Sequence, residues 1–196
     1  MIQWRAVQPD CMAKDLADAL ARLSFVDTMA ITATLLKGPL VLFEPEARAA
    51  IRNHVSPRRE ESGGLLLGQA FVPSNLITAV QFPVVIVSKA VPAHEYHGTS
   101  VSLHMGPSVW ESVRTEVGLL VVGWFHSHPN LGAFFSGTDR KTQREFFYHE
   151  YSIGYVMDPV RDDHAYFISE ESSQVSREQV LDVSARLVSE AMSRCK

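Results

Sequence analysis

The sequence contains few cysteines and no excess of positive charge. Its two cysteines, Cys11 and Cys195, lie near opposite ends of the 196-residue chain. Disulfide bonds are therefore not expected to organise the fold, and a reducing compartment fits the composition. The 18 Lys and Arg against 22 Asp and Glu give a net charge of −4. A chain without a basic field has neither nucleic acid nor an anionic membrane as its default partner.

Membrane-spanning and targeting segments are also not evident. Residues 62–88 carry no charge, which raises the question of a membrane span. Pro73, Asn75 and Pro83 interrupt this run, so we expect two buried strands joined by a turn. The N-terminal residues lack a basic region followed by an unbroken apolar stretch, so no secretory signal is predicted. We therefore expect a cytoplasmic protein with no membrane partner.

The chain has enough apolar residues, 46%, to build a folded core, and its length predicts one main domain. Apolar runs predict strands at 40–43, 65–67, 76–87, 118–125, 153–157 and 165–168. Helical spacing predicts helices at 12–23, 45–55, 138–148 and 176–194, and a further helix with Ser108 at its N-cap. Residues 91–107 show no periodicity and are expected to form a long loop. Strands that alternate with helices predict an α/β fold with a mixed β-sheet flanked by helices.

The strongest strand signal leads directly into two histidines. The apolar run 118–125 is followed by His126, Ser127, His128 and Pro129. Because residues i and i+2 of a strand point to the same face, both imidazoles are expected to converge on one point. Pro129 interrupts the ladder, which leaves that face open at the end of the sheet.

A carboxylate follows at a spacing that completes a candidate metal site. Ser136 lies eight residues after His128 and leads into a predicted helix, which places Asp139 in or beside the first helical turn. Two imidazoles and one carboxylate form a three-ligand set suited to a catalytic zinc ion, with the fourth tetrahedral position left to water. A histidine pair alone is more often structural, but the additional Pro, Ser and Asp favour the metal site.

An acidic pair upstream supplies a candidate proton acceptor. Glu60 and Glu61 precede the predicted strand 65–67, which can lie beside the histidine-bearing strand. A carboxylate near a zinc-bound water can accept its proton and return it to a leaving amine. The residues alone leave both glutamates open for this role, and a charged turn entering a buried strand is the alternative interpretation.

Together these segments resemble the signature of the JAMM (MPN+) zinc metalloproteases, and the short chain resembles their stand-alone prokaryotic type. The family pattern is an upstream Glu, then His-x-His, seven residues that usually begin with Pro, and Ser-x-x-Asp. In this chain His126 and His128 begin the pattern, 129–135 are the seven residues, and Ser136 and Asp139 close it. The resemblance implies the JAMM/MPN fold, a mixed sheet with cytidine-deaminase-like architecture.

The resemblance also selects one glutamate and assigns roles. The family Glu lies three residues before the first Gly of a strand in which three aliphatic residues separate two glycines. That Gly is Gly64 here, so Glu61 is selected over Glu60. Glu61 is implied to act as general base and then general acid in the hydrolysis of a peptide or isopeptide bond. The implied Zn²⁺ ligands are His126, His128 and Asp139, and Ser136 is implied to help hold the oxyanion.

The implied substrate is ubiquitin or a ubiquitin-like protein with an extended C-terminal tail, released from a conjugate or a precursor. Stand-alone prokaryotic relatives accompany ubiquitin-like conjugation systems, including antiviral ones, or sulfur-carrier proteins. A hydrolase that processes a sulfur carrier, a hydrolase of small amides and a non-catalytic MPN-fold scaffold remain alternatives, although scaffolds typically lack the metal ligands. The loop from Val91 to Pro107 is the expected contact with the substrate tail, in preference to a second zinc site at His94, His97 and His104.

The resemblance covers about residues 39–170, and this suggests the domain organisation. We expect residues 1–38 to form an N-terminal extension and residues 39–196 to form the metalloprotease domain with a C-terminal helix. The extension has no counterpart in the minimal family domain. We expect it to bind a partner protein, such as one encoded by a neighbouring gene, or to cover the active site.

Overall fold

The computed structural model of the protein describes residues 12–56, 60–73, 80–93, 96–99, 102–105, 107–114, 116 and 118–183, with only the backbone described between 96 and 108. The helices are α1 (Leu16–Leu20), α2 (Phe25–Leu35), α3 (Pro45–Val55), α4 (Pro107–Val113), α5 (Gly137–Phe146) and the 3₁₀ helix η1 (Arg177–Gln179). None of the helices in these ranges is long and apolar enough to cross a membrane.

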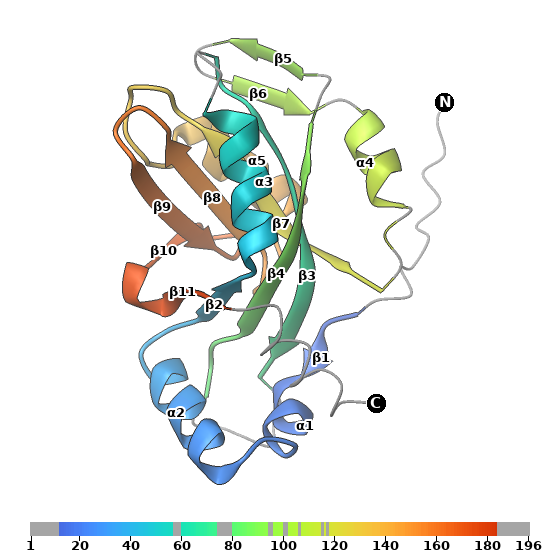
Figure 1. Ribbon diagram of the computed structural model, residues 1–196, viewed down its shortest axis with the longest axis vertical. Helices are drawn as coiled ribbons and strands as arrows, with labels where there is room; N and C mark the ends of the chain where they lie inside the picture. The colour runs from blue at the N-terminus through green and yellow to red at the C-terminus, as the bar shows by residue number, and fades with distance from the viewer. Residues whose placement is uncertain are drawn as a thin grey trace.

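A mixed sheet forms the centre of the molecule (Figure 1). Its strands are β1 (Lys14–Asp15), β2 (Leu40–Phe43), β3 (Gly63–Val72), β4 (Val84–Pro92), β7 (Leu120–Ser127), β8 (Ile153–Asp158), β9 (Asp163–Ile168), β10 (Ser173–Val175) and β11 (Val180–Asp182). The strand order is β10-β9-β8-β7-β3-β4-β2-β11, and β1 pairs with the end of β3. The pairs β2–β4, β7–β8 and β11–β2 are parallel, whereas β3 runs antiparallel to both β4 and β7. The predicted α/β fold with a mixed sheet is confirmed.

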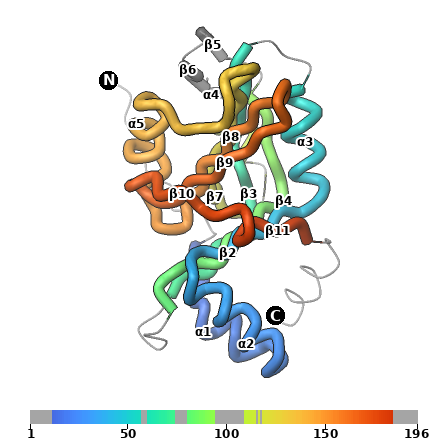
Figure 2. Tube along the Cα trace, turned by 90° about the vertical axis from the view of Figure 1, so that its left-hand side faces the viewer, coloured from blue at the N-terminus to red at the C-terminus, as the bar shows by residue number. Residues whose placement is uncertain are grey.

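Helices cover both faces of this sheet. In the views of Figures 1 and 2, α3 lies on one face and α5 on the other, while α1 and α2 lie together beyond one end of the strands. Ala47, Ile51 and Val55 of α3 belong to one buried cluster. A second cluster, on the α5 face, contains Phe147 at the C-terminal end of α5. The sheet is therefore the middle layer between two cores.

Alternation along the strands decides which face each side chain reaches. Trp124 and Phe125 are neighbours in β7, yet they belong to clusters on opposite faces of the sheet, and so do Val156 and Tyr155 of β8. His126 follows Trp124 by two residues and therefore lies on the same face as Trp124. That face is the one covered by α5.

Several predicted elements occur as expected. The segments 40–43 and 45–55 form β2 and α3, and β8 and β9 form the predicted hairpin. Pro45 occupies the first turn of α3, where a missing N–H costs no hydrogen bond. The charge-free run 62–88 contains β3 and the beginning of β4, as two strands rather than one helix. Of the predicted strand 76–87, only residues 84–87 belong to β4, and residues 76–79 lie outside the described residues.

The predicted helix at 176–194 is wrong over its first half. Residues 177–179 form η1 and residues 180–182 form β11, and residues 184–196 lie outside the described residues. β11 pairs in parallel with β2, with Val180 opposite Val41 and Asp182 opposite Phe43. Pairing with the free backbone edge of β2 outweighs the helical spacing of the apolar residues, and that edge is not visible in the local sequence.

Three further corrections concern loops and element ends. The segment 91–107 is not one long loop, because β5 (Tyr96–Thr99) and β6 (Ser102–Met105) form a two-stranded sheet within it. The helix predicted at 12–23 shrinks to α1, which Asp15 caps through a hydrogen bond from the backbone N of Ala17. The helix predicted after Ser108 begins at Pro107, so Ser108 lies within α4 rather than before it. Where such elements begin and end depends on a few backbone hydrogen bonds, and the spacing of apolar residues does not predict these bonds.

Candidate metal centre

The pairing of β3 with β7 brings the acidic segment beside the histidines. Gly63 lies opposite His126, so Glu61 is placed just beyond the end of β3 and next to the His-x-His segment. Glu61 is buried with 4% of its surface exposed, whereas its rival Glu60 is exposed. The structure thus places Glu61, and not Glu60, at the histidine pair.

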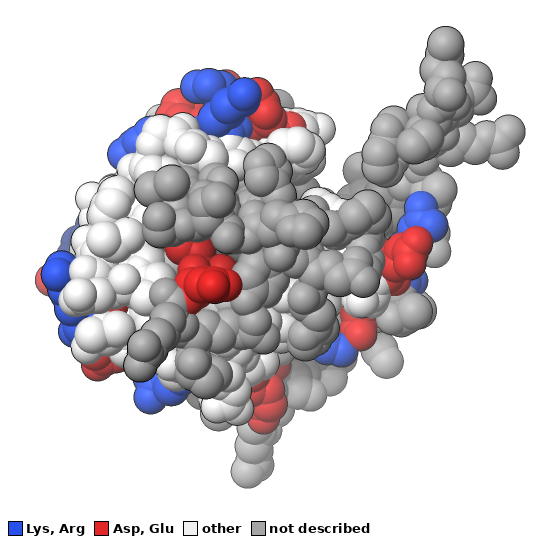
Figure 3. All heavy atoms as spheres, turned by 90° about the horizontal axis from the view of Figure 1, so that it is seen from above, with Lys and Arg blue, Asp and Glu red and all other residues white. Residues whose placement is uncertain are grey.

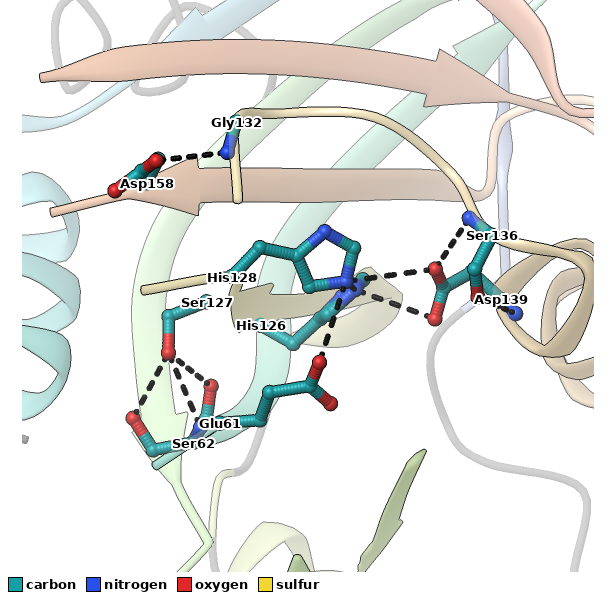
Figure 4. Close-up of polar contacts among 9 residues, drawn as sticks. All are labelled: Glu61, Ser62, His126, Ser127, His128, Gly132, Ser136, Asp139 and Asp158. Carbon is teal, nitrogen blue, oxygen red and sulfur yellow. Dashed lines mark hydrogen bonds and ion pairs between the residues drawn. The ribbon is translucent and has the colours of Figure 1, made fainter. Parts of the chain in front are cut away.

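A serine pair extends this connection past the end of the sheet (Figure 4). The backbone N of Ser127 donates to the carbonyl O of Ser62 at 2.8 Å, and the backbone N of Ser62 donates to Oγ of Ser127 at 3.1 Å. The two hydroxyl oxygens are 3.3 Å apart, and both residues are fully buried. Sequence reasoning missed this pair. Its effect is to hold the residue after Glu61 against the residue between the two histidines.

Two imidazoles and one carboxylate converge on a single point in Figure 4. The Nε2 atoms of His126 and His128 are 3.1 Å apart. Asp139 places Oδ1 at 3.2 Å from Nε2 of His126 and Oδ2 at 3.7 Å from Nε2 of His128. All three side chains are buried, and among the described residues they form a group that can hold a metal ion.

Asp139 owes its position to the first turn of α5. Ser136 is the N-cap of this helix, and its Oγ accepts a hydrogen bond from the backbone N of Asp139 at 3.2 Å. In return Oδ2 of Asp139 accepts from the backbone N of Ser136 at 2.6 Å. This reciprocal capping box is a stable local motif, and it aims the carboxylate at the histidines. Asp139 therefore lies in the first turn, where the spacing predicts it.

The separations among these atoms fit a tetrahedral zinc site. Two ligand atoms that each lie about 2.0–2.1 Å from a zinc ion at the tetrahedral angle are about 3.3 Å apart. The 3.1 Å between the two Nε2 atoms and the 3.2 Å from Nε2 of His126 to Oδ1 of Asp139 are close to that edge length. The 3.7 Å contact of His128 is with the other carboxylate oxygen, Oδ2. Two nitrogens and one oxygen also match the donor set of catalytic zinc, which leaves one position for water or substrate. His126, His128 and Asp139 are the residues that would hold the ion.

The protonation states of the ligands suit metal binding at neutral pH. Burial, together with the neighbouring His126, lowers the pKa of His128 from 6.5 to about 4, so its imidazole is neutral. Burial alone would raise the pKa of Asp139, but hydrogen bonds from His126 and Ser136 outweigh it and lower the pKa from 3.8 to about 2. A neutral imidazole and an ionised carboxylate are the forms that bind a cation.

Glu61 lies at the edge of this group without being part of it. Its Oε1 is 3.7 Å from Nε2 of His128. Burial raises the pKa of Glu61, the nearby His126 opposes the rise, and the carboxylate of Asp139 adds to it. A carboxylate whose pKa is raised towards neutrality is a better proton acceptor and donor than an exposed one.

Trp124 and Gln143 support the candidate ligands by packing and hydrogen bonding. The Trp124 indole stacks on the His126 imidazole, and its Nε1 donates to Oε1 of Gln143 at 2.7 Å. Gln143 lies one helical turn after Asp139 and also donates to the carbonyl oxygens of Phe147 and Ser152. Sequence reasoning missed both residues. The available signal was that Gln143 follows Asp139 by four positions and so shares its helix face.

Asp158 anchors the loop between the second histidine and Ser136. This fully buried carboxylate accepts hydrogen bonds from the backbone N atoms of Asn130 at 2.9 Å and Gly132 at 2.7 Å. It also accepts from Val160 and Arg161 in its own turn. Asp158 was likewise missed. The Asp158-Pro159 step after an apolar strand signals a turn, but not that the turn holds a distant loop.

Other sequence-predicted residues are not brought to this centre in the part of the chain described. His97 and His104 face each other across β5 and β6 by backbone register, and their side chains are not described. His94, Cys11 and Cys195 lie outside the described residues. The role of the segment 91–107 in substrate contact therefore stays a prediction.

The face seen from above in Figure 3 carries charge of both signs at different places. A group of acidic atoms lies near the middle of this face, and Lys and Arg side chains gather at its edge. Apolar residues at the metal centre's rim are also exposed, since Phe134 has 47% of its surface accessible and its ring lies 4.9 Å from that of His128.

The fold and the buried cluster together define an α/β domain with a His-His-Asp group that could hold a metal ion. A family model for prokaryotic homologs of the JAB domain matches residues 44–169, which is more than half of the chain. The chain therefore belongs to this family. All of the residues that converge at the centre lie within the matched range, whereas α1 and α2 lie outside it.

Two proteasome-related proteins are similar to this chain over part of its length. The 26S proteasome non-ATPase regulatory subunit 14 of Drosophila melanogaster is 44% identical over 105 residues, which cover 50% of this chain and 31% of the relative. The ubiquitin carboxyl-terminal hydrolase RPN11 of Saccharomyces cerevisiae is 30% identical over 105 residues with the same coverage. The chain thus spans less than a third of these relatives' length.

Solved structures show the same fold. The solution structure of protein DSY2949 from Desulfitobacterium hafniense superposes with a TM-score of 0.54 and 15% sequence identity. The match covers 74% of this chain and 94% of that one. At this identity the likeness concerns the fold alone.

Proposed function

We propose that this protein is a zinc-dependent isopeptidase or peptidase that releases ubiquitin or a ubiquitin-like protein from a conjugate or a precursor in the cytoplasm. The observation that carries the proposal is the position of Glu61 beside the buried group of His126, His128 and Asp139. Membership of the JAB family and similarity to RPN11, a ubiquitin carboxyl-terminal hydrolase by name, support the substrate class.

When bound by His126, His128 and Asp139, zinc would supply a Lewis acid and lower the pKa of a coordinated water. Glu61 accepts a proton from the attacking water and passes it to the nitrogen of the scissile amide. A C–O bond forms first and gives a tetrahedral oxyanion, and the C–N bond then breaks as the carbonyl re-forms. The products are an amine that carries the proton from Glu61 and a carboxylic acid, which releases the second proton of the water as it ionises to a carboxylate. The buried position of Glu61 keeps its carboxyl group close to both proton transfers.

Ser136 has two parts in this proposal. Its capping contacts with Asp139 orient the carboxylate ligand. Its hydroxyl hydrogen, which also contributes a hydrogen bond to the Asp139 carboxylate, would turn towards the oxyanion that forms during hydrolysis.

The substrate's C-terminal tail is proposed to bind as an extended strand along the β5–β6 hairpin. A two-stranded sheet leaves one backbone edge of each strand without a strand partner among the described residues. An extended peptide can add to such an edge through main-chain hydrogen bonds. The flexible tail of a ubiquitin-like protein has the required extended form.

The test uses purified full-length protein with linear fusions and isopeptide-linked conjugates of ubiquitin and of prokaryotic ubiquitin-like proteins. Wild type with zinc is expected to cleave one of them, and Glu61→Gln is expected to lose at least about a hundredfold in rate while still binding zinc. Glu60→Gln, the matched neighbour, is expected to retain the rate.

Measuring the metal content of variants distinguishes a metal ligand from the proton acceptor. His128→Ala is expected to lose zinc by elemental analysis, whereas Glu61→Gln is expected to keep it because Glu61 is not a ligand. Cleavage that persists in zinc-free protein, or in Glu61→Gln at the wild-type rate, contradicts the mechanism. Zinc binding without cleavage of any conjugate or fusion would favour the scaffold alternative.

A further inference from the structure

Helix α2 presents apolar residues on both of its sides. On the inner side, Leu35 is fully buried and Ile31 packs against the same cluster, with Leu16 and Leu20 of α1. On the outer side, Val26 is 73% exposed, Met29 55% and Leu36, just after the helix, 60%. A helix that is apolar all round is normally buried all round. The outer side of α2 is therefore an incomplete packing surface.

The outer residues form a continuous stripe at helix–helix packing spacing. Val26, Met29, Ala33 and Leu36 follow one another at intervals of three or four residues, and Ala30, four residues after Val26, lies between them on the same side. The two alanines in the middle of the stripe allow another helix to approach closely. The larger side chains at the ends supply apolar area, and Phe25 at the edge is 79% exposed. We name these five residues the α2 stripe.

Charge indicates what fits the α2 stripe. Residues 24–37 contain only two charged side chains, Asp27 near the beginning and Lys37 just after the end. Both are exposed. If a second α2 packed antiparallel on the first, Asp27 of each copy would lie near Lys37 of the other. A parallel arrangement would place like charges together, so the stripe is complementary to itself about a two-fold axis.

The position of α2 leaves the metal centre accessible in such a pair. The centre lies at the Gly63 end of β3, whereas Phe71, at the other end of the strand, packs in the cluster of α1 and α2. Eight residues of strand separate these ends by about 26 Å. In Figure 2, α1 and α2 lie together beyond that end of the sheet. Two copies joined through α2 would therefore hold their metal centres far apart.

We propose that the α2 stripe is a homodimer interface in which two copies of this chain pack α2 against α2 in antiparallel orientation. The interface is an addition to the family domain, because α2 precedes the matched residues 44–169. The N-terminal segment was expected to bind a partner or to cover the active site. Its described part lies at the opposite end of β3 from Glu61, and the partner proposed for it is a second copy.

The first test compares two alanine-to-glutamate variants by sedimentation equilibrium of the full chain across the micromolar range. Wild type is expected to approach twice the mass of one chain. Ala33→Glu, in the stripe, is expected to raise the dimer dissociation constant at least about a hundredfold. The substitution occurs twice in a two-fold symmetric interface, which would therefore bury two unpaired charges. Ala49→Glu, at an exposed position of α3, is the matched control and is expected to change it less than about twofold.

The second test exchanges the charges. Asp27→Lys and Lys37→Asp are each expected to weaken the dimer about fivefold, since each ion pair occurs twice. The double variant is expected to recover the wild-type constant. Thermal unfolding of each variant shows whether the loss of the Asp27 contact with Ser24 disturbs the helix. A monomeric wild type, equal effects of Ala33→Glu and Ala49→Glu, or a double variant as weak as the single ones would overturn the proposal.

Discussion

The indole ring of Trp124 lies flat against the imidazole of His126, with ring centroids 4.6 Å apart and ring planes inclined by 7°. The same indole donates a hydrogen bond to Gln143 on α5, the helix that carries Asp139. One aromatic side chain therefore connects the strand that carries the histidines with the helix that carries the carboxylate. Any change at His126 is transmitted to the π system of Trp124.

This contact predicts an optical signal for metal binding. Zinc added to the metal-free protein should change the tryptophan emission, because the electron density of the imidazole stacked on Trp124 changes when its Nε2 binds a cation. Trp110→Phe should keep the signal, and Trp124→Phe should lose it. Fluorescence titration beside elemental analysis checks this. Emission that stays constant while zinc binds stoichiometrically would contradict the prediction.

The metal-free protein should lose stability as the pH falls from 6.5 to 4. The unfolded chain protonates His128 near its ordinary pKa of 6.5, whereas burial beside His126 lowers the pKa in the folded chain to about 4. The unfolded state binds more protons across this window, so the free energy of unfolding decreases as pH decreases. Asp139, whose pKa is lowered from 3.8 to about 2 in the folded chain, causes a second decrease in the free energy of unfolding as the pH falls from 3.8 to about 2.

Urea unfolding midpoints measured between pH 8 and pH 3 check the first window. His128→Gln removes the group that titrates, so its midpoint should fall less steeply between pH 6.5 and 4 than that of the metal-free wild type. Equal slopes for the two proteins would show that His128 is not the group responsible.

Asp158→Asn should destabilise the fold and weaken metal binding. The substitution removes the charge and one acceptor oxygen from a buried side chain that accepts four backbone N–H groups, two of them from the loop after His128. We expect a loss of about 1–3 kcal/mol in the free energy of unfolding. Asp162→Asn, at a highly exposed position of the same turn, is the matched control and should change stability by less than about 0.5 kcal/mol. Equal effects of the two variants would argue against an anchoring role for Asp158.

Gly154→Ala should disturb the metal centre through Phe135. A methyl group at Gly154 would lie 2.2 Å from Cζ of Phe135, whose ring is stacked against Phe167 at a centroid distance of 4.0 Å. Phe135 directly precedes the capping Ser136, so its displacement shifts Asp139. We expect at least about 1–3 kcal/mol of destabilisation and a weaker zinc affinity.

Gly137→Ala serves as the control for this substitution, because a methyl group there meets no atom within 4 Å. Its stability should stay within about 1 kcal/mol of wild type, since alanine is favoured over glycine in a helix. Calorimetric melting and zinc competition with a chelator provide both measurements. Unchanged zinc affinity in Gly154→Ala would show that Phe135 can move without displacing Asp139.

Much of the fold was predictable from local patterns. The strand 40–43, the helix 45–55 and the hairpin 153–168 follow from apolar runs, Pro45 and turn residues. The terminal strand β11 and the hairpin β5–β6 were not predictable in this way. Both form because a backbone edge is available nearby in space, and no residue within either segment indicates where that edge is.

Local patterns in the sequence were sufficient to predict the three candidate metal ligands. Two local features suffice for this prediction. The i, i+2 spacing puts the side chains of His126 and His128 on the same face of their strand. Ser136 as the N-cap puts Asp139 in the first turn of the helix. The resemblance to JAMM proteins then singled out Glu61.

The contacts that hold those residues in place became visible only in the folded chain. Trp124, Gln143, Asp158 and the pair Ser62 and Ser127 support the centre through contacts between segments that are far apart in the chain. Such contacts depend on strand order and on which face of the sheet α5 covers. The outer face of α2 is a similar case, because sequence shows that the helix is apolar but only packing shows which side remains exposed. The periodicity of apolar side chains shows which face of a helix or strand is buried. The strand order of the sheet then decides which other element packs against that face.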